Sequence, residues 1–266
     1  MRNPLAERFQ QTNSITSVDK TVRKVLILLF WLGVWQLVSV LTHNSIVLAG
    51  PWETVKALSG MIQTGEYWQS VGFTLARIFL GLACGIMIGV LAGLLSGRYP
   101  VAGEFLSLPV TVVKAVPVVS FIIMVIIWAG NRNLAFWISL VVVMPQLYFN
   151  TLAGWKTTDR RMLEMADCFR MPAVSRARYV YFPTLYPFLK SALQAAIGMA
   201  WKSGVAAEVI GQPLGSIGNG LYRSKIFLET DAVFAWTISI ILFAWISEKL
   251  LLGVFGLLRP GRKYGI

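Results

Sequence analysis

Long apolar runs separated by short polar segments dominate the pattern along this chain of 266 residues. A helix needs roughly 20 mainly apolar residues to cross the hydrocarbon core of a bilayer. Six runs are close to that length, and they lie at about residues 25–42, 70–95, 105–129, 133–153, 185–210 and 232–257. The pattern therefore predicts an all-α membrane protein with six transmembrane helices.

Composition indicates the same class of protein. Hydrophobic residues make up 56% of the chain and charged residues only 14%, which is too apolar for an ordinary soluble domain. The net charge of +12 could indicate nucleic acid, but the basic residues flank the apolar runs instead of alternating with aromatic residues. We therefore expect membrane lipid as a partner and no nucleic acid.

The distribution of Lys and Arg predicts the orientation. Most basic residues outside the six runs lie in the N-terminal segment, in residues 154–184 and in the C-terminal segment. Because such residues are enriched on the cytoplasmic side, we expect both termini and this long polar segment to be cytoplasmic. The N-terminal segment 1–24 lacks the apolar core and cleavage site of a secretory signal, so we expect it to be retained as a tail.

Glycine and proline mark two of the runs. In the second run glycines recur at four-residue spacing, a pattern that lets two helices approach closely; they are Gly81, Gly85, Gly89 and Gly93. In the third run, Pro109 and Pro117 each remove a backbone donor and are expected to bend the helix. Residues 50–68 form an amphipathic segment with Pro51 in a first-turn position, which predicts a short helix at the outer interface.

The polar segment MLEMADCFRMPAVSRARYVYFP, residues 162–183, has a helical composition interrupted by Pro172. We expect two short helices at an angle, projecting from the membrane, with a second stop at Pro183. Apolar residues share one face of the first helix; they are Met162, Met165, Ala166 and Phe169. The segment is either a solvated loop with interfacial arginines or a docking surface for a partner protein.

Catalytic residues are scarce. His43 is the only histidine, which excludes a His-based zinc site and argues against a Ser-His-Asp triad. Cys84 and Cys168 lack metal-ligand spacing, so no metal site is predicted. No Gly-Lys dipeptide occurs, so the phosphate-binding P-loop is absent and energy for uphill transport must come from another chain. Glu208 is the one acid well inside a run, whereas a proton relay strings several ionisable groups together.

Charges inside the runs are costly and need a reason. Lys202, midway along the fifth run, either lines a cavity or serves an ion pair or a carbonyl cap between helices. Glu208 follows six residues later, rotated by about 240° on an ideal helix, so these two do not pair on one face. Lys114, ahead of Pro117, lies at an inner gate or snorkels to the headgroups. Arg77 meets lipid or a neighbouring loop. A cavity shared by both lysines would favour an anionic solute.

The polar segment resembles the EAA loop of bacterial ABC importer permeases, whose pattern is Glu-Ala-Ala, three residues, Gly, and a proline nineteen residues after the glutamate. The triplet is represented here by Glu164, Met165 and Ala166. Pro183 keeps the spacing, nineteen residues after Glu164. Arg170 stands where the family has glycine, so the turn is expected to be made differently, at Pro172.

Other segments are similar to permeases of the nitrate/sulfonate/taurine type, in the same order. They are GPWETVKALSGMIQTGEYWQSVGFTLARIFLGLACGIMIGVLAGLLSGRYP (50–100), VKAVPVVSFIIMVIIWAG (113–130) and GMAWKSGVAAEVIGQPLGSIGNGLYRSKIFLETDAVFAW (198–236). The resemblance therefore covers nearly the whole chain from about residue 25. It implies a type I ABC importer permease fold, like that of the methionine importer, in the bacterial cell membrane.

That resemblance also implies an organisation and partners. Residues 25–258 would form the permease domain, including a cytoplasmic coupling loop at 156–183, between tails at 1–24 and 259–266. The partners would be a second permease copy or paralogue, two cytoplasmic ABC ATPase subunits and an extracytoplasmic solute-binding protein. This chain would bind no cofactor, because ATP and Mg would bind the ATPase subunits.

The resemblance and the intramembrane charges together predict two sets of site residues. Those for ATPase coupling are Glu164, Met165, Ala166, Asp167, Phe169, Arg170 and Pro183. Those for the translocation pathway of a small solute are Lys114, Pro117, Trp201, Lys202 and Glu208. The alternative is a secondary transporter or channel that works without an ATPase; inverted repeats and several intramembrane acids would favour it, and neither is visible in the sequence.

Overall fold

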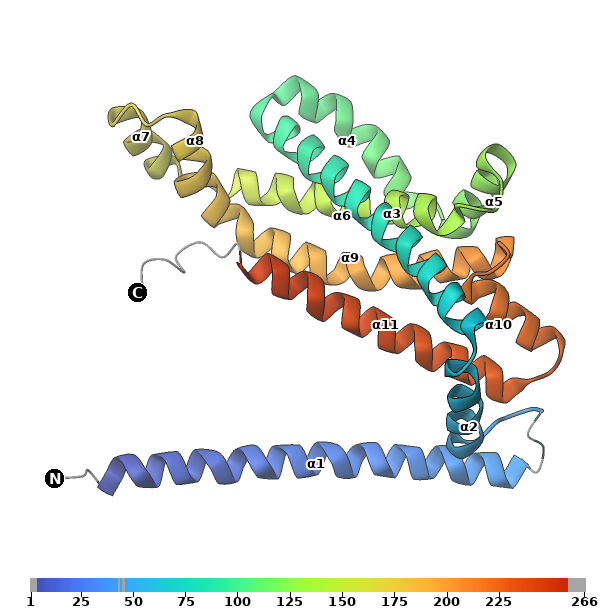
Figure 1. The fold of residues 1–266 in the computed structure, drawn as a ribbon. Coiled ribbons are helices and arrows are strands. Elements are labelled where there is room, and N and C mark those ends of the chain that lie inside the picture. The colour runs from blue at the N-terminus through green and yellow to red at the C-terminus, as the bar shows by residue number, and fades with distance from the viewer. Residues whose placement is uncertain (1–3, 43, 45, 258–266) are drawn as a thin grey trace. The chain divides into compact units, whose positions relative to one another are not determined.

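The computed structural model describes residues 4–42, 44 and 46–257, which are almost entirely helical and contain no strand (Figure 1). The helices are α1 (Pro4–Thr42), α2 (Pro51–Ile62), α3 (Gly65–Arg98), α4 (Pro100–Ala115), α5 (Val118–Ala129), α6 (Leu134–Lys156), α7 (Arg160–Cys168), α8 (Ala173–Arg176), the π-helical turn η1 (Ala177–Tyr181), α9 (Phe182–Gly211), α10 (Ile217–Ile226) and α11 (Thr230–Leu257). His43 and the predicted tail 259–266 lie outside the described residues.

Four described helices are long and apolar enough to cross a membrane: α3, α6, α11 and the part of α1 from Val22 to Thr42. A fifth candidate is the pair α4 and α5, which are bent by 101° at a short break. The predicted fifth run coincides with α9, a helix of 30 residues that is not among these candidates. The described part of the chain thus holds four or five candidate spans. The remaining span of the predicted six, the one at α9, stays a prediction.

The break between α4 and α5 lies at Pro117. Val116, just before it, is extended, with ψ at 132°, because a following proline disfavours the helical conformation. Helix α4 continues through Pro109 without interruption. Of the two predicted bends, only the one at Pro117 therefore divides a helix.

The glycine stripe of α3 packs directly against α6. A Cβ atom added to Gly81 would lie 2.3 Å from the carbonyl oxygen of Phe136, and one added to Gly89 would lie 2.5 Å from that of Met144. Separations this short leave no room for a side chain, so the predicted close approach of two helices is confirmed. The paired residue numbers rise together, which means that α3 and α6 run parallel. The pair α4 and α5 makes the return between them.

Helix α9 lies antiparallel to α6. Near one end, a Cβ on Gly154 would lie 2.9 Å from Leu185, and farther along the Ser139 hydroxyl donates to the Ala200 carbonyl at 3.3 Å. Residues of α5, α6 and α9 enclose a shared core, made of Ile122, Leu134, Ile138 and Ala207. The C-terminal ends of α3 and α6 and the N-terminal end of α9 consequently lie at the same end of this helix layer.

By its internal contacts the chain divides into two units, residues 1–61 with 224–235 and residues 62–223 with 236–266. In the first unit the end of α1 binds the segment that leads into α2: the Trp35 indole donates to the Ala49 carbonyl at 3.1 Å. Helix α2 begins at Pro51 as expected and exposes Trp52 and Val55. All sites described below lie in the second unit.

Candidate functional site

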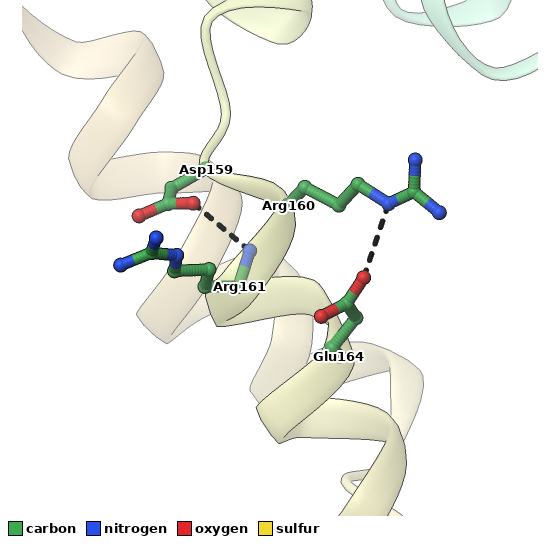
Figure 2. A network of polar contacts seen from close by, with 4 residues as sticks. All are labelled: Asp159, Arg160, Arg161 and Glu164. Atoms are coloured by element: carbon green, nitrogen blue, oxygen red, sulfur yellow. Dashed lines mark hydrogen bonds and ion pairs between the residues drawn. The ribbon is translucent and has the colours of Figure 1, made fainter.

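Helix α7 opens the polar segment and is capped by Asp159. The Asp159 carboxylate accepts a hydrogen bond from the backbone N–H of Arg161 at 2.9 Å (Figure 2). This contact satisfies one of the amides that a helix start leaves without a partner. One turn apart, Arg160 Nε and Glu164 Oε1 form an ion pair at 3.0 Å, and both side chains are mostly exposed.

The surface of α7 carries the apolar residues that the sequence placed on one face, but they divide between inside and outside. Ala166 is fully buried in this chain. Met162 and Met165 are each 46% exposed and Phe169 is 77% exposed. Helix α7 and its C-cap therefore expose two methionines and a phenylalanine among charged residues. Ala166 lies on the side of the helix that is buried within the same chain.

The end of α7 is closed by Arg170 in the left-handed conformation, with φ at 48°. The Arg170 N–H donates to the Asp167 carbonyl at 2.9 Å, and the Met171 N–H donates to the Ala166 carbonyl at 2.8 Å. These two bonds are those of a Schellman motif, whose left-handed position usually holds glycine. The expectation that Pro172 makes the turn is wrong: Arg170 adopts the conformation that glycine would supply, and Pro172 begins the next helix as the N-cap of α8.

A substitution at this position tests the conformation. A left-handed residue with a Cβ costs roughly 1 kcal/mol, a cost that glycine does not have. We expect Arg170→Gly to stabilise the end of α7 relative to Arg170→Ala by about that amount, since both variants remove the same charge. Hydrogen exchange of the backbone amides at positions 170 and 171 should be about fivefold slower in Arg170→Gly than in Arg170→Ala. Equal exchange in both variants would mean that the residue is not held in this conformation.

Beyond the turn, the chain is helical without a break from Ala173 to the end of α9, through the π-helical turn η1. Pro183 is the second residue of α9, directly after η1, and the helix continues through it, so the predicted stop at Pro183 is wrong. A local π-helical adjustment of this kind accommodates a missing N–H inside a helix. An ion pair between Asp167 and Arg176 joins α7 to this long helix. The rings of Trp155 and Tyr181 stack at 4.1 Å between centroids and hold η1 against the end of α6.

A cavity of about 380 Å³ lies where the bent pair α4 and α5 meets α6 and α9. Its wall is mainly apolar, with valines and phenylalanines, and its polar side chains are Lys114, Gln146 and Asn150. The Lys114 ammonium lies 5.0 Å from the centroid of the Phe149 ring, within the range of a cation–π interaction. Lys114 therefore turns toward the cavity, which favours the first of the two interpretations of this residue.

Pro117 stays beside Lys114, between the cavity residues Val116 and Val118, but the other three predicted pathway residues are not brought together with Lys114. Lys202 is exposed and is not among the residues that line this cavity, whereas Trp201 is almost completely buried. Glu208 is fully buried. The expectation that Lys202 and Glu208 do not share a face is confirmed, because one is exposed and the other is inside.

Glu208 belongs to a buried cluster that the sequence did not predict. Its Oε2 atom accepts hydrogen bonds from the Thr74 hydroxyl at 2.8 Å and from the Gly218 N–H at 3.2 Å. The Thr74 hydroxyl oxygen in turn accepts from the Ile217 N–H at 3.0 Å. The cluster ties α9 to α3 and to the start of α10. The only sequence signal was the isolated acid itself, since Thr74 is 134 residues away.

Arg77 donates from Nε to the carbonyl of Arg132 at 2.8 Å, in the loop between α5 and α6, which confirms the interpretation that Arg77 meets a neighbouring loop.

Within the described residues, no group of three or more His, Cys, Asp or Glu is placed to hold a metal ion.

Comparison with known proteins shows the family of this chain. The family described as "Binding-protein-dependent transport system inner membrane component" matches residues 85–263, more than half of the chain. A relative from Escherichia coli, provisionally named aliphatic sulfonates transport permease protein SsuC, is 29% identical over 219 residues, 81% of each chain. The taurine transport system permease protein TauC of the same organism is 27% identical over 186 residues, 68% of this chain and 66% of the relative.

The bicarbonate transport system permease protein CmpB of Synechocystis is 22% identical over 160 residues, 60% of this chain and 57% of the relative. These names agree with the resemblance drawn from the sequence. The chain belongs to the family of binding-protein-dependent transport system inner membrane components, and it is the permease subunit of an ABC importer of the nitrate/sulfonate/taurine type.

Proposed function

We propose that this permease has the six-span type I fold and that α7 is its coupling helix, seated in a cleft of a separate ATPase subunit. The observation that carries the proposal is the surface of α7, where Met162, Met165 and Phe169 are exposed among charges. Exposed Met and aromatic side chains in a polar surrounding are typical of protein interfaces. Two ATPase subunits, a second permease copy or paralogue and an extracytoplasmic binding protein complete the assembly.

The orientation follows from which helix ends lie together. Arg98 ends α3 and Lys156 ends α6, at the same end of the helix layer as the start of α9 and the segment before it. Basic residues are enriched on the cytoplasmic side, so we assign this end to the cytoplasm. Helix α9 then crosses back as the fifth span and α11 is the sixth, with both termini cytoplasmic.

Transport would be driven through α7. ATP and Mg bind to the ATPase subunits, whose closure moves the docked α7. The Asp167–Arg176 ion pair and the helix that is continuous from Ala173 through α9 carry this displacement into the membrane. The cavity with Lys114 also has a wall residue on α9, Met199, so a movement of α9 changes the shape of that cavity. The outcome is an alternation of access by rigid-body movement.

The solute is small and anionic in this proposal. The cavity of about 380 Å³ offers one ammonium group, two amide side chains and an otherwise apolar wall. Sulfonates, taurine and bicarbonate, for which the relatives are named, each carry a negatively charged oxygen-rich group. A lysine in a cavity of low polarity attracts such a group more strongly than it would in water.

Removal of the Lys114 charge tests the solute class. We expect Lys114→Gln to raise the KM for import of an anionic solute about tenfold, because the opposite charge is lost in an apolar site. Lys249→Gln is the matched control, since Lys249 lies over the Trp245 ring on α11 and outside this cavity. Import that is unchanged in Lys114→Gln would remove this cavity from the pathway.

Reconstitution separates the proposal from a secondary transporter. The permease is co-expressed with the ATPase, and the complex is placed in proteoliposomes with the binding protein. We expect solute uptake only when ATP is present on the side of the membrane where the ATPase subunits lie. A proton or sodium gradient alone should drive no uptake. Uptake by the permease without the ATPase would contradict the proposal.

A further inference from the structure

A second cavity, of about 700 Å³, lies where the C-terminal ends of α3 and α6 meet α8 and η1. One part of its wall is apolar and consists of leucines of α3: Leu91, Leu94 and Leu95. The other part holds both arginines of the wall, Arg98 at the end of α3 and Arg176 in α8, together with the aromatic residues Tyr99, Trp155 and Tyr181 and three apolar residues, Met171, Ala173 and Ala177. The cavity is therefore amphipathic along the direction of α3.

With α3 as a membrane span, the two parts of the wall lie at different depths in the bilayer. Arg98 is the last residue of α3, and Leu91 lies seven residues earlier, which is about 10 Å along a helix. The arginine thus falls at the level of the lipid headgroups and the leucines fall at the level of the acyl chains. The stacked rings of Trp155 and Tyr181 are at the arginine end, as expected for aromatic residues at a membrane interface.

We propose that this cavity binds one anionic phospholipid, with its phosphate between Arg98 and Arg176 and an acyl chain along Leu91, Leu94 and Leu95. Guanidinium groups bind phosphate oxygens through paired hydrogen bonds. Basic pockets between membrane helices are sites of this kind. The inference goes beyond the proposed function and does not depend on which ATPase or solute this permease uses.

The combination of an apolar wall and two arginines favours an anionic lipid over other ligands. A free phosphate would contact the two arginines but leave the leucine wall without an apolar partner. An acyl chain of a zwitterionic lipid would cover the leucines, but its headgroup has a positive charge beside the two guanidinium groups. Of these three ligands, the anionic phospholipid is the one that satisfies both parts of the wall.

One residue of the cavity wall, Arg176, also forms an ion pair with α7. Arg176 pairs with Asp167 of α7, and its side chain is only 28% exposed. A lipid phosphate at this guanidinium would therefore help to hold α8 in the position in which the ion pair forms. Among the residues that the structure describes, Arg98 forms no ion pair with α7, and its guanidinium lies 5.6 Å from the Tyr99 ring centroid. Arg98 is consequently the cleaner position for a test.

The test uses the full-length permease, purified in mild detergent and titrated with phosphatidylglycerol or phosphatidylcholine, with bound lipid counted by native mass spectrometry. We expect the wild type to retain phosphatidylglycerol in preference to phosphatidylcholine. Arg98→Gln should weaken phosphatidylglycerol binding about fivefold, the effect of one basic residue at an anionic lipid surface. Arg178→Gln is the matched control, because Arg178 is two residues from Arg176 and does not line the cavity.

A second variant blocks the cavity without changing its charge. Ala173 is an exposed residue of the wall, and Ala173→Trp should obstruct the cavity and weaken lipid binding while the protein stays monodisperse. Three outcomes would overturn the proposal. They are equal retention of both lipids, equal retention by Arg98→Gln and Arg178→Gln, and displacement of the lipid by millimolar inorganic phosphate, which would identify a soluble anion as the ligand.

Discussion

We expect Phe169→Asp to weaken the binding of the ATPase subunits to this permease at least about 30-fold, while the membrane helices stay folded. Phe169 is 77% exposed, so the variant loses little burial within its own chain. An aromatic side chain at the centre of an interface contributes about 2 kcal/mol or more, and a buried carboxylate in its place is worse. The measurement is a pull-down of the ATPase by the solubilised permease, with ATP-driven uptake as a second readout.

A matched control separates this effect from a general effect of new charge. Leu214, in the segment after α9, is 86% exposed and lies at the opposite end of α9 from α7. Leu214→Asp makes the same chemical change there and should leave the pull-down unchanged. If Phe169→Asp and Leu214→Asp retain the ATPase equally, α7 is not the docking helix.

Two further variants probe the same helix. Glu164→Lys reverses the charge of a residue whose ion pair with Arg160 is exposed, and exposed pairs of this kind contribute less than about 1 kcal/mol to stability. Deletion of residues 160–170 removes α7 altogether. We expect both proteins to insert in the membrane and to lose coupling to the ATPase. An undiminished pull-down by the deletion variant would count against the assignment.

The second large effect concerns the fold. We expect Gly81→Ala to destabilise the permease by about 3 kcal/mol, because the added Cβ would lie 2.3 Å from the backbone carbonyl oxygen of Phe136. A backbone atom cannot rotate away as a side chain can, so α3 and α6 would have to separate. The measurement is the yield of monodisperse protein in detergent and its thermal unfolding midpoint.

Two glycines of α3 supply the controls. A Cβ on Gly85 would lie 3.0 Å from the Leu140 carbonyl oxygen and from the Val143 Cβ, so Gly85→Ala should cost less, about 1 kcal/mol. A Cβ on Gly72 has no neighbour within 4 Å, and Gly72→Ala should be neutral or stabilising by up to about 1 kcal/mol through helix propensity. Equal stability of the Gly81 and Gly72 variants would contradict the packing of α3 on α6.

Several parts of the site were predictable because they depend on local sequence. The run at 70–95 is long and apolar enough to require a helix, and its glycine spacing indicated a close helix partner before any partner was known. The helical composition around 160–170 and the proline at 172 likewise predicted a short helix followed by a break. The partner of the glycine stripe, α6, could not be predicted, since many apolar helices would accept such a stripe.

Other features run against local preferences or depend on contacts between distant residues. The left-handed conformation of Arg170 runs against its intrinsic preference, so the turn was expected elsewhere. Pro183 was interpreted as a stop, although the π-helical turn just before it lets the helix continue through the proline. The partner of Glu208 is Thr74, on a helix far away in the sequence.

The sequence by itself determined that this chain is a multi-helix membrane protein with a polar helical segment, because the length of apolar runs and the distribution of charge are local properties that a bilayer selects directly. Only the tertiary structure decided which charged residues share a space. Lys114 and Lys202 look equivalent in sequence, yet one turns to a cavity and the other is exposed. The rotation and partner of each helix set that difference, and these arise from side-chain packing between helices, which the pattern along one helix does not encode.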